Sequence, residues 1–468
     1  MECMHDEGVA SWAQAEFGRA DIEDRRWGRR LVCVAARAAR RPAGRVTDTF
    51  RDDAERQGAY GLLESEAVDP AAVALATFEA AASRSAEESF VYCAVDGTSL
   101  NLADHQGEKF GPVGVRSKRG RGVKVMNAVL LSPKGVVLGL SSQRFWLRSE
   151  RRRRKHRDEL RPEQKETGQW LAALQQTRGV MRAHAPKTRC WFQLDREGDA
   201  WPLLLDAGSD GHWFTIRSCR NRHVTLADGS RSTVSKVMAA QPVLTTYQLE
   251  VKGSAKRRAR TATMAVRACT VVLNLRDKRT GARFSKSVNV VQAREQGSTP
   301  VGEKRIEWTL LTNHPITKVK DLTEVVFGYA MRWRIEELHR TWKSGACNVE
   351  ETQLRSTGAV IKWATILMAV AARIERIKQL SREEPDRSAT DEFTPIEIKA
   401  AALLRFGKAA KAHLPDGSVP TIAEVTLWIA KIGGYTGRSS SGGPPGSAIL
   451  ARGLADVRTA AQALEALG

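Results

Sequence analysis

Apolar residues between positions 89 and 208 gather into short runs whose length and period predict alternating strands and helices. A turn signal, Ser132-Pro133-Lys134-Gly135, separates two of these runs. The predicted elements are, in order, strands at 89–100, 122–131 and 135–147, a helix at 167–183, a strand at 190–195 and a helix at about 199–208. This order is typical of a mixed α/β domain.

The flanking regions have other patterns. Residues 211–312 alternate short segments rich in Val, Thr, Tyr and Leu with basic loops, which predicts a β-rich insertion. A strongly basic loop is predicted at 148–166, and a flexible joint rich in Gly, Ser and Pro at 439–447. Helical periods cover residues 10–65, 320–380, 393–435 and 448–467.

One predicted helix, from Asp21 to Arg41, has two contrasting sides, and Pro42 ends it. Its apolar side carries Trp27, Leu31, Val34 and Ala38. The opposite side carries Arg26, Arg29, Arg30, Arg37, Arg40 and Arg41. Such a stripe is either a solvated basic face or a surface that lies along DNA phosphates, and the lack of an acid on the stripe favours DNA.

The composition supports a polyanionic partner. The formal net charge of this 468-residue chain is +21, which favours nucleic acid first and an anionic membrane surface second. No basic amphipathic segment with bulky aromatic anchors supports the membrane alternative, and no apolar run predicts a membrane-spanning helix. The seven cysteines form no Cys-x-x-Cys pair, which predicts reduced structural thiols. We therefore expect a cytoplasmic bacterial protein, associated with the nucleoid when bound to DNA.

Two aspartates follow apolar strands in the predicted α/β domain. Asp96 stands in FVYCAVDGTSL and Asp195 in CWFQLDREGDAWPLL. Each alone is an ordinary turn or helix-capping residue. Together they make a shared divalent-metal site plausible, because hard cations prefer carboxylate oxygens.

A third acid, Glu336, stands in the helical string FGYAMRWRIEELHRTWKSG. Helical spacing places Tyr329, Arg332, Glu336 and Lys343 on one face with Arg340 beside them, and places Phe327, Met331, Ile335, Leu338 and Trp342 on the other, core-facing side. The first face is either a solvated set of charge pairs or part of a site. With the two aspartates, Glu336 completes the acids of a two-metal phosphoryl-transfer site, in which Arg332 and Lys343 would grip DNA phosphates.

These strings together resemble the IS4 family of transposases. The family's Tyr-Arg-Glu-Lys signature corresponds to Tyr329, Arg332, Glu336 and Lys343, and its two aspartate strings to Asp96-x-Thr98-Ser99-Leu100 and Asp195-Arg196-Glu197-x-Asp199. Weaker similarity extends over most of residues 10–380. Any one of these strings is moderately specific, and their combination is highly specific.

The resemblance implies an α/β fold with a ribonuclease H-like catalytic core. It implies an N-terminal helical DNA-binding domain at 1–72, a catalytic domain at 73–385 with the β-rich insertion at about 211–312, and a C-terminal helical dimerisation region at 386–468. Asp96, Asp195 and Glu336 are expected to bind two Mg²⁺ ions, with Mn²⁺ as a substitute. The expected partners are double-stranded DNA, as transposon ends and as target, and a second copy of the chain in the synaptic complex.

The resemblance also implies cut-and-paste transposition: nicking of the transposon end, formation and opening of a DNA hairpin, and joining of the 3′-hydroxyl to target DNA. A hairpin needs a base flipped out of the duplex, which aromatic rings hold by stacking. Trp308 and Trp333 match the family's base-holding tryptophans, although core packing also accounts for such residues. Residues that match the family's DNA contacts are Arg217, Tyr329, Arg332, Arg340 and Lys343.

Three alternatives stay open at this point. The first is a nuclease of the same fold that cleaves DNA without strand transfer. The second is a catalytically silent DNA-binding repressor, although all three acids are present. The third is a basic RNA-binding protein, although no RNA-binding motif is visible.

Overall fold

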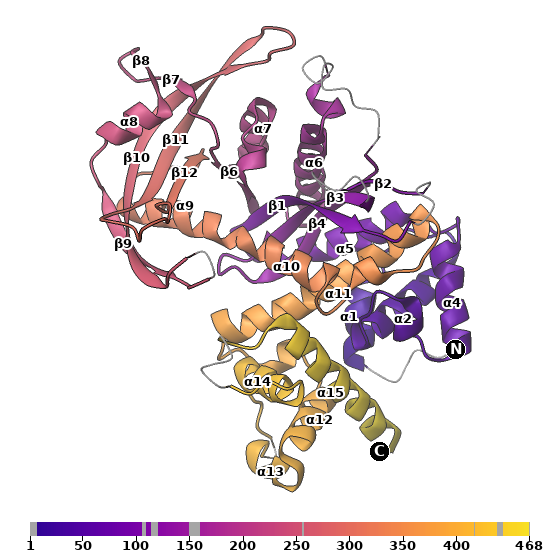
Figure 1. The fold of residues 1–468 in the computed structure, drawn as a ribbon. Coiled ribbons are helices and arrows are strands. Elements are labelled where there is room, and N and C mark those ends of the chain that lie inside the picture. Colours follow the sequence, from indigo (N-terminus) through magenta and orange to yellow (C-terminus); the bar gives the residue numbers. More distant parts are fainter. Residues whose placement is uncertain are drawn as a thin grey trace.

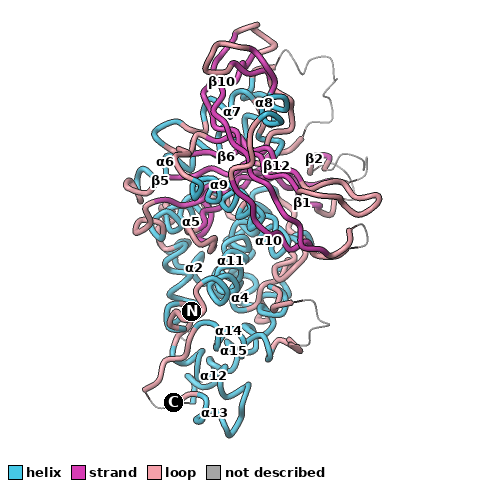
Figure 2. Tube along the Cα trace, turned by 90° about the vertical axis from the view of Figure 1, so that its left-hand side faces the viewer, coloured by secondary structure: helices cyan, strands magenta, loops and turns pink. Residues whose placement is uncertain are grey.

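The protein is described from a computed structural model that covers residues 7–104, 109–113, 120–148, 160–254, 257–415, 417–437 and 443–467. Most of the predicted basic loop, residues 149–159, lies outside the described residues, as do 438–442 of the predicted joint. Strands gather in one half of the molecule, and the N-terminal and C-terminal helices gather in the other (Figures 1 and 2).

The N-terminal part is helical, as predicted. Its helices are α1 (Glu7–Phe17), α2 (Arg25–Arg40), α3 (Val46–Thr49), α4 (Asp53–Glu64) and α5 (Pro70–Arg84). Helix α2 begins four residues later than predicted, because the Asp24 side chain accepts a hydrogen bond from the Arg26 amide and so caps the helix there. Leu31 and Val34 are buried on its inner side, and Trp27 is half-buried.

A mixed sheet forms the centre of the fold. Its first strands and helices are β1 (Phe90–Asn101), β2 (Gly111–Pro112), β3 (Arg121–Leu131), β4 (Val137–Trp146), η2 (Pro162–Gln164), α6 (Glu166–His184), β5 (Arg189–Leu194), η3 (Arg196–Gly198), α7 (Trp201–Asp206), η4 (Ser209–Gly211) and β6 (Trp213–Arg217). Strands β1, β3 and β4 pair antiparallel, whereas β5 pairs parallel with both β1 and β6. The spatial order β4-β3-β1-β5-β6 confirms the mixed α/β class.

The β-rich insertion extends the same sheet. It contains β7 (His223–Thr225), β8 (Arg231–Thr233), α8 (Val234–Ala240), β9 (Thr245–Val251), β10 (Arg260–Arg276), β11 (Arg283–Glu295) and β12 (Glu307–Thr312). The range 211–312 needs correction at its start, because β6 pairs with β5 and belongs to the central strands. Strand β12 then pairs with β6 and connects the insertion to the centre of the sheet.

Three helices follow the sheet: α9 (Val319–Met331), α10 (Trp333–Lys343) and, after the short η5 (Val349–Glu351), α11 (Thr357–Glu383). Helix α11 is long and apolar enough to cross a membrane, but 83% of its most apolar window is buried inside the protein. Trp363 on α11 is fully buried and donates a hydrogen bond to the Gly44 carbonyl oxygen at 2.7 Å. Helix α11 is therefore a core helix, packed against the N-terminal helices and β4.

The C-terminal region is helical, as predicted. It contains η6 (Ala389–Asp391), α12 (Pro395–Phe406), η7 (Gly407–Ala409), α13 (Ala410–His413), α14 (Ile422–Ile432) and α15 (Ser447–Leu467). Arg458 of α15 is almost fully buried and donates hydrogen bonds to Glu397 of α12 and to the Ala39 carbonyl oxygen of α2. Arg458 thus connects the C-terminal helices α12 and α15 to the N-terminal helix α2.

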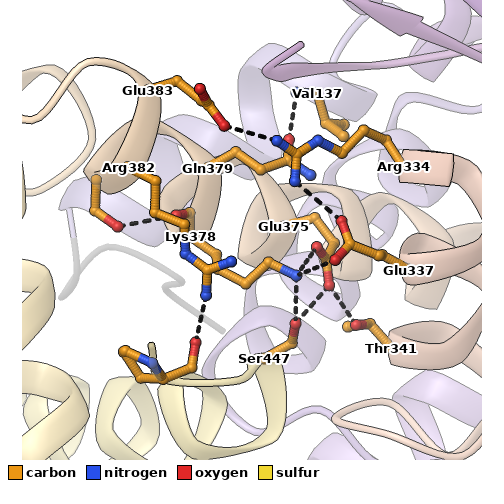
Figure 3. A network of polar contacts seen from close by, with 12 residues as sticks. Val137, Arg334, Glu337, Thr341, Glu375, Lys378, Gln379, Arg382, Glu383 and Ser447 are labelled. Carbon is orange, nitrogen blue, oxygen red and sulfur yellow. Dashed lines mark hydrogen bonds and ion pairs between the residues drawn. The ribbon is translucent and has the colours of Figure 1, made fainter. Parts of the chain in front are cut away.

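A buried polar network fixes α10 against α11 and the start of α15 (Figure 3). The carboxylate of Glu375, which is fully buried, accepts hydrogen bonds from Thr341 and from Ser447, both at 2.5 Å. Lys378 forms an ion pair with the same carboxylate and donates to the Ser447 hydroxyl at 3.2 Å. On α10, Glu337 lies 3.8 Å from the Lys378 ammonium group. Because a buried charge is costly without partners, this network allows α10 few other positions.

Candidate functional site

Two of the predicted acids meet where β1 and β5 stop pairing. The parallel register ends with Val95 opposite Leu194, so Asp96 and Asp195 are the next residues of neighbouring strands. Strand β1 extends to Asn101, close to the predicted range 89–100, so Asp96 lies within the strand and the residues after it pair with β3 alone. Asp195 instead leaves the sheet and caps η3, where it accepts a hydrogen bond from the Glu197 amide at 2.7 Å. Strands β1 and β5 therefore separate at the two aspartates, and we call this point the fork.

The third acid, Glu336, is connected to the fork by Arg332, which pairs with both Glu336 and Asp96. Arg332 Nη1 donates to Asp96 Oδ2 at 3.2 Å, and Arg332 Nη2 donates to Glu336 Oε1 at 2.6 Å. Asp96 and Glu336 are 240 positions apart in the sequence, yet one guanidinium joins them. The structure thus brings these two acids and Arg332 together.

A helix break at Arg332 shapes this contact. The sequence predicts one helix through the signature, but α9 ends at Met331 and α10 begins at Trp333. The Arg332 amide donates to the Tyr329 carbonyl oxygen at 3.1 Å, and the Ile335 amide donates to the Arg332 carbonyl oxygen at 3.2 Å, so the turn is tighter than an α-helix. Glu336 lies in the first turn of α10, where the helix dipole stabilises a carboxylate.

The charges at the fork are strongly coupled. Burial raises the pKa of Asp96 to about 7, the nearby Arg332 opposes that rise, and the negative charges of Asp195 and Glu336 add to it. The charge of Asp96 is thus opposed by two other carboxylates, and Arg332 pairs with Asp96 and with Glu336. Such a site attracts further positive charge.

The chemistry of this donor set fits divalent cations, since all three acids supply hard oxygen ligands. Within the described ranges, no group of three or more His, Cys, Asp or Glu side chains is already arranged around one ion position. Arg332 lies between Asp96 and Glu336 in this conformation, so these carboxylates would have to exchange the guanidinium for cations.

A second cluster lies beside the acids. The Trp308 ring, on β12, packs edge to face against the Tyr329 ring, with 5.1 Å between the two ring centres. The Arg332 guanidinium lies 5.9 Å from the centre of the Tyr329 ring. Arg217, on β6, donates to the Glu307 carbonyl oxygen at 3.2 Å, next to Trp308. Tyr329 is buried and Trp308 is half-buried, whereas Trp333 is 51% exposed. Trp333 therefore has the more accessible ring of the two tryptophans.

The predicted core-facing side of the signature helix is correct only in part. Ile335, Leu338 and Trp342 are fully buried, as expected. Phe327, however, is 42% exposed, while Tyr329 is buried on the side predicted to face the site. Helix α9 packs on the sheet, where Tyr329 meets the Trp308 ring of β12. Helix α10 packs on α11, where Trp342 donates to the Ala364 carbonyl oxygen.

The two remaining cations of the signature region differ in their contacts. Lys343 forms an ion pair with Glu350 at 3.4 Å, and Glu350 also accepts a hydrogen bond from the Asn101 amide at the end of β1. Arg340 is exposed on α10. Arg340 is therefore open to a ligand in this conformation, whereas Lys343 is engaged by an acid of the protein.

Sequence reasoning missed a buried pair that fixes α10 to the sheet. Asn127, opposite Asp96 on β3, has its amide nitrogen 2.9 Å from Nε2 of His339 on α10. Both side chains are buried, and His339 follows Glu336 by one helical turn. The sequence signal was a polar residue, Asn127, inside an otherwise apolar strand, and such a residue needs a partner when buried.

Another missed residue is Lys124 on β3, whose neighbour on β1 is Ser99. Burial lowers its pKa, the positive charge of Arg148 lowers it further, and Glu166 and Glu197 oppose the change. Asp199, in contrast, has a structural role, because its carboxylate binds Arg222 and the Cys219 amide. Of the two aspartates in the DREGD string, Asp195 is the one whose charge acts on Asp96.

The arginine stripe of α2 is partly neutralised. Arg26 pairs with Asp24 at 2.8 Å, and Arg37 pairs with Glu55 of α4. The expectation of a stripe without acids is therefore wrong in three dimensions, since α4 supplies one. Arg29 and Arg30 are exposed, and the Arg30 guanidinium lies 5.7 Å from the centre of the Trp27 ring.

Comparisons with known proteins bear on the N-terminal part first. Residues 9–68 match a family model described as transposase DNA-binding. This match indicates a transposase and DNA as its partner. A solved structure, the cryo-EM structure of the piggyBac transposase synaptic complex with hairpin DNA, is similar over 81% of this chain and 77% of that chain, with 9% identity and a TM-score of 0.40. That similarity is low in both sequence and structure.

The His339 contact predicts a pH dependence of stability. Burial lowers the pKa of His339 to about 3 from 6.5, so the folded state keeps the ring neutral while the unfolded chain takes up a proton. The stabilising contribution is present above pH 6.5 and is lost as the pH falls towards 3, by about 1.4 kcal/mol per pH unit. Thermal melting from pH 7 to pH 5 should show a smaller loss of stability in His339→Gln than in the wild type. The exposed-residue control His223→Gln should keep the wild-type slope, and an unchanged slope in His339→Gln would contradict the prediction.

Proposed function

We propose that the protein is a DNA transposase of the IS4 family that moves an insertion sequence by two-metal phosphoryl transfer. One observation carries the proposal: the register of β1 and β5 makes Asp96 and Asp195 neighbours at the end of their pairing, and Arg332 pairs with both Asp96 and Glu336. The transposase DNA-binding match at residues 9–68 supports DNA as the substrate.

The topology supports a ribonuclease H-like core. Three antiparallel strands are followed by a helix and two parallel strands, in the spatial order β4-β3-β1-β5-β6. The acids come from β1, from the end of β5 and from a helix after the sheet. This arrangement supports the assignment of Asp96, Asp195 and Glu336 as catalytic residues.

In the proposed reaction, Asp96, Asp195 and Glu336 would hold two Mg²⁺ ions, for which Mn²⁺ could substitute. When bound, such ions would supply activation of the attacking hydroxyl and neutralisation of the charge on the phosphate. The protein residues orient the DNA. Arg332 and Lys343 exchange their acidic partners for phosphate oxygens, and Arg340 and Arg217 contact the flanking backbone.

The proposal includes the order of DNA steps. Water attacks the phosphodiester at the transposon end and releases a 3′-hydroxyl. This hydroxyl attacks the opposite strand, which forms a hairpin and displaces the 3′-hydroxyl of the flanking DNA. A second water opens the hairpin, and the regenerated 3′-hydroxyl then attacks target DNA in a homodimeric complex of two ends, displacing a 3′-hydroxyl of the target strand. Trp308 and Trp333 hold the flipped base during hairpin formation, for which the exposed ring of Trp333 and the half-buried ring of Trp308 offer stacking surfaces.

The proposed function makes a first prediction about the third acid, Glu336. Glu336→Gln should reduce cleavage of a labelled transposon-end duplex by about a thousand-fold or more in Mg²⁺, because a neutral amide is a poor cation ligand. Binding of the duplex should remain. Glu337→Gln is the matched control, since Glu337 is the next residue and pairs with Arg334. Cleavage by Glu336→Gln at the Glu337→Gln rate would remove Glu336 from the active site.

The second prediction concerns the N-terminal arginines. Changing Arg29 and Arg30 together to Ala should weaken binding to the end duplex and reduce the salt dependence of log K by about 2, because two phosphate contacts are lost. The control, Lys408→Ala with Lys411→Ala, removes the same charge from exposed positions near the C-terminus. Equal salt slopes in the two double variants would show that α2 does not contact the phosphates.

The third prediction separates a transposase from a simple nuclease. Trp308→Ala should lower the yield of hairpin about ten-fold while the first nick keeps its rate, because a stacked base is held by about 1–3 kcal/mol. Trp308→Phe retains a flat ring and should restore much of the yield. Denaturing gels resolve nick and hairpin, and an unchanged hairpin yield in Trp308→Ala would assign Trp308 to packing.

A further inference from the structure

A cavity of about 570 Å³ lies on the side of β4 that faces α1 and α11. Its walls come from α1, α5, β4, α11, η6 and the start of α12, so N-terminal, central and C-terminal elements all contribute. The cavity is separate from the acids at the fork, since none of Asp96, Asp195 and Glu336 lines it. Its volume falls in the range of small-molecule sites, about 300–1,000 Å³.

Three arginines line the cavity, and two of them, Arg84 and Arg376, pair with acids of the protein. Arg84 donates to Glu16 at 2.8 Å and to the Leu138 carbonyl oxygen at 2.6 Å. Arg376 donates to Glu392 at 2.6 Å. These contacts tie α1 to β4 and α11 to η6, so the walls of the cavity are formed before any ligand arrives.

Arg373 is the exception. It is 6% exposed and lines the cavity, yet its Nη1 is buried without a hydrogen-bond partner among the described residues. Its guanidinium forms no ion pair with a described acid, and its one ring contact is with Trp12 at 5.2 Å. The lining acids do not serve it, since Asp391 pairs with Arg387 and the other two with Arg84 and Arg376.

We propose that this cavity binds a small organic anion, with a carboxylate or phosphate group paired to Arg373 and an apolar body against Trp12 and Leu138. A buried guanidinium without an anion destabilises the fold, so an anionic ligand supplies what the protein lacks there. Alanines 369 and 372 and Phe393 complete an apolar wall that suits a flat or branched carbon skeleton. Because the walls join three parts of the chain, the ligand also holds those parts against one another.

Thermal melting and calorimetry of the full chain test the proposal. The probes are phenyl phosphate, benzoate, inorganic phosphate and the neutral benzyl alcohol, each at millimolar concentration. Phenyl phosphate or benzoate should raise the Tm with the logarithm of its concentration and bind once per chain, whereas benzyl alcohol should not. The comparison of phenyl phosphate with benzoate identifies the anionic group.

Arg373→Met removes the charge while keeping an apolar side chain. It should abolish the ligand-dependent rise in Tm and leave the unliganded Tm equal to or above that of the wild type. Arg405→Met is the matched control, because Arg405 also lies over an aromatic ring, that of Phe406, but outside the cavity. The control should keep the wild-type response.

Three outcomes would overturn the proposal. The first is no rise in Tm with any of the three anions. The second is an equal rise in Arg373→Met, which would place the anion elsewhere. The third is a large fall in the unliganded Tm of Arg373→Met, which would make Arg373 a structural residue whose contact with Trp12 suffices.

Discussion

The parallel register of β1 and β5 is the constraint on which the candidate site depends. Because pairing stops after Val95 and Leu194, Asp96 and Asp195 are the first residues of the two neighbouring strands that no longer pair with each other. Burial and mutual repulsion make this position unfavourable for two charged carboxylates, and Arg332 offsets that cost by pairing with Asp96. The acids are therefore held together by the backbone of the sheet and one buried guanidinium, and α10 has to lie where Arg332 and Glu336 can reach them.

Helix α10 is held from two sides. Towards the sheet, His339 contacts Asn127, and towards the C-terminal helices, Thr341 donates to Glu375, which also accepts from Ser447 of α15 (Figure 3). Both contacts are buried, where a lost hydrogen bond costs about 1–3 kcal/mol. The position of Glu336 thus depends on residues more than a hundred positions away, and the C-terminal region contributes to the geometry of the site.

Sequence reasoning found the strands of the sheet because buried strands are apolar and turn residues bound them. It found β1 over nearly its full length, since the strand predicted at 89–100 is observed as Phe90–Asn101, but it placed Asp96 at the end of an apolar strand, whereas the polar residues after Asp96 still pair with β3. It placed β6 in the insertion, because a short apolar strand carries no information about its partner. It also missed the helix break at Arg332, where neither proline nor glycine marks the tight turn. The acids themselves were visible, but the pairing that joins Asp96 to Asp195 depends on register, which one sequence does not contain.

The cations that the proposed function assigns to DNA are mostly engaged by acids of the protein. Arg332 pairs with Asp96 and Glu336, and Lys343 pairs with Glu350. A DNA phosphate offers the same charge and the same two-oxygen geometry as a carboxylate, so an exchange preserves the hydrogen bonds of the guanidinium. If Arg332 moved to a phosphate, Asp96 and Glu336 would lose their cationic partner, and divalent cations would supply the positive charge in its place. Under the proposed function, binding of DNA and binding of metal would therefore favour each other.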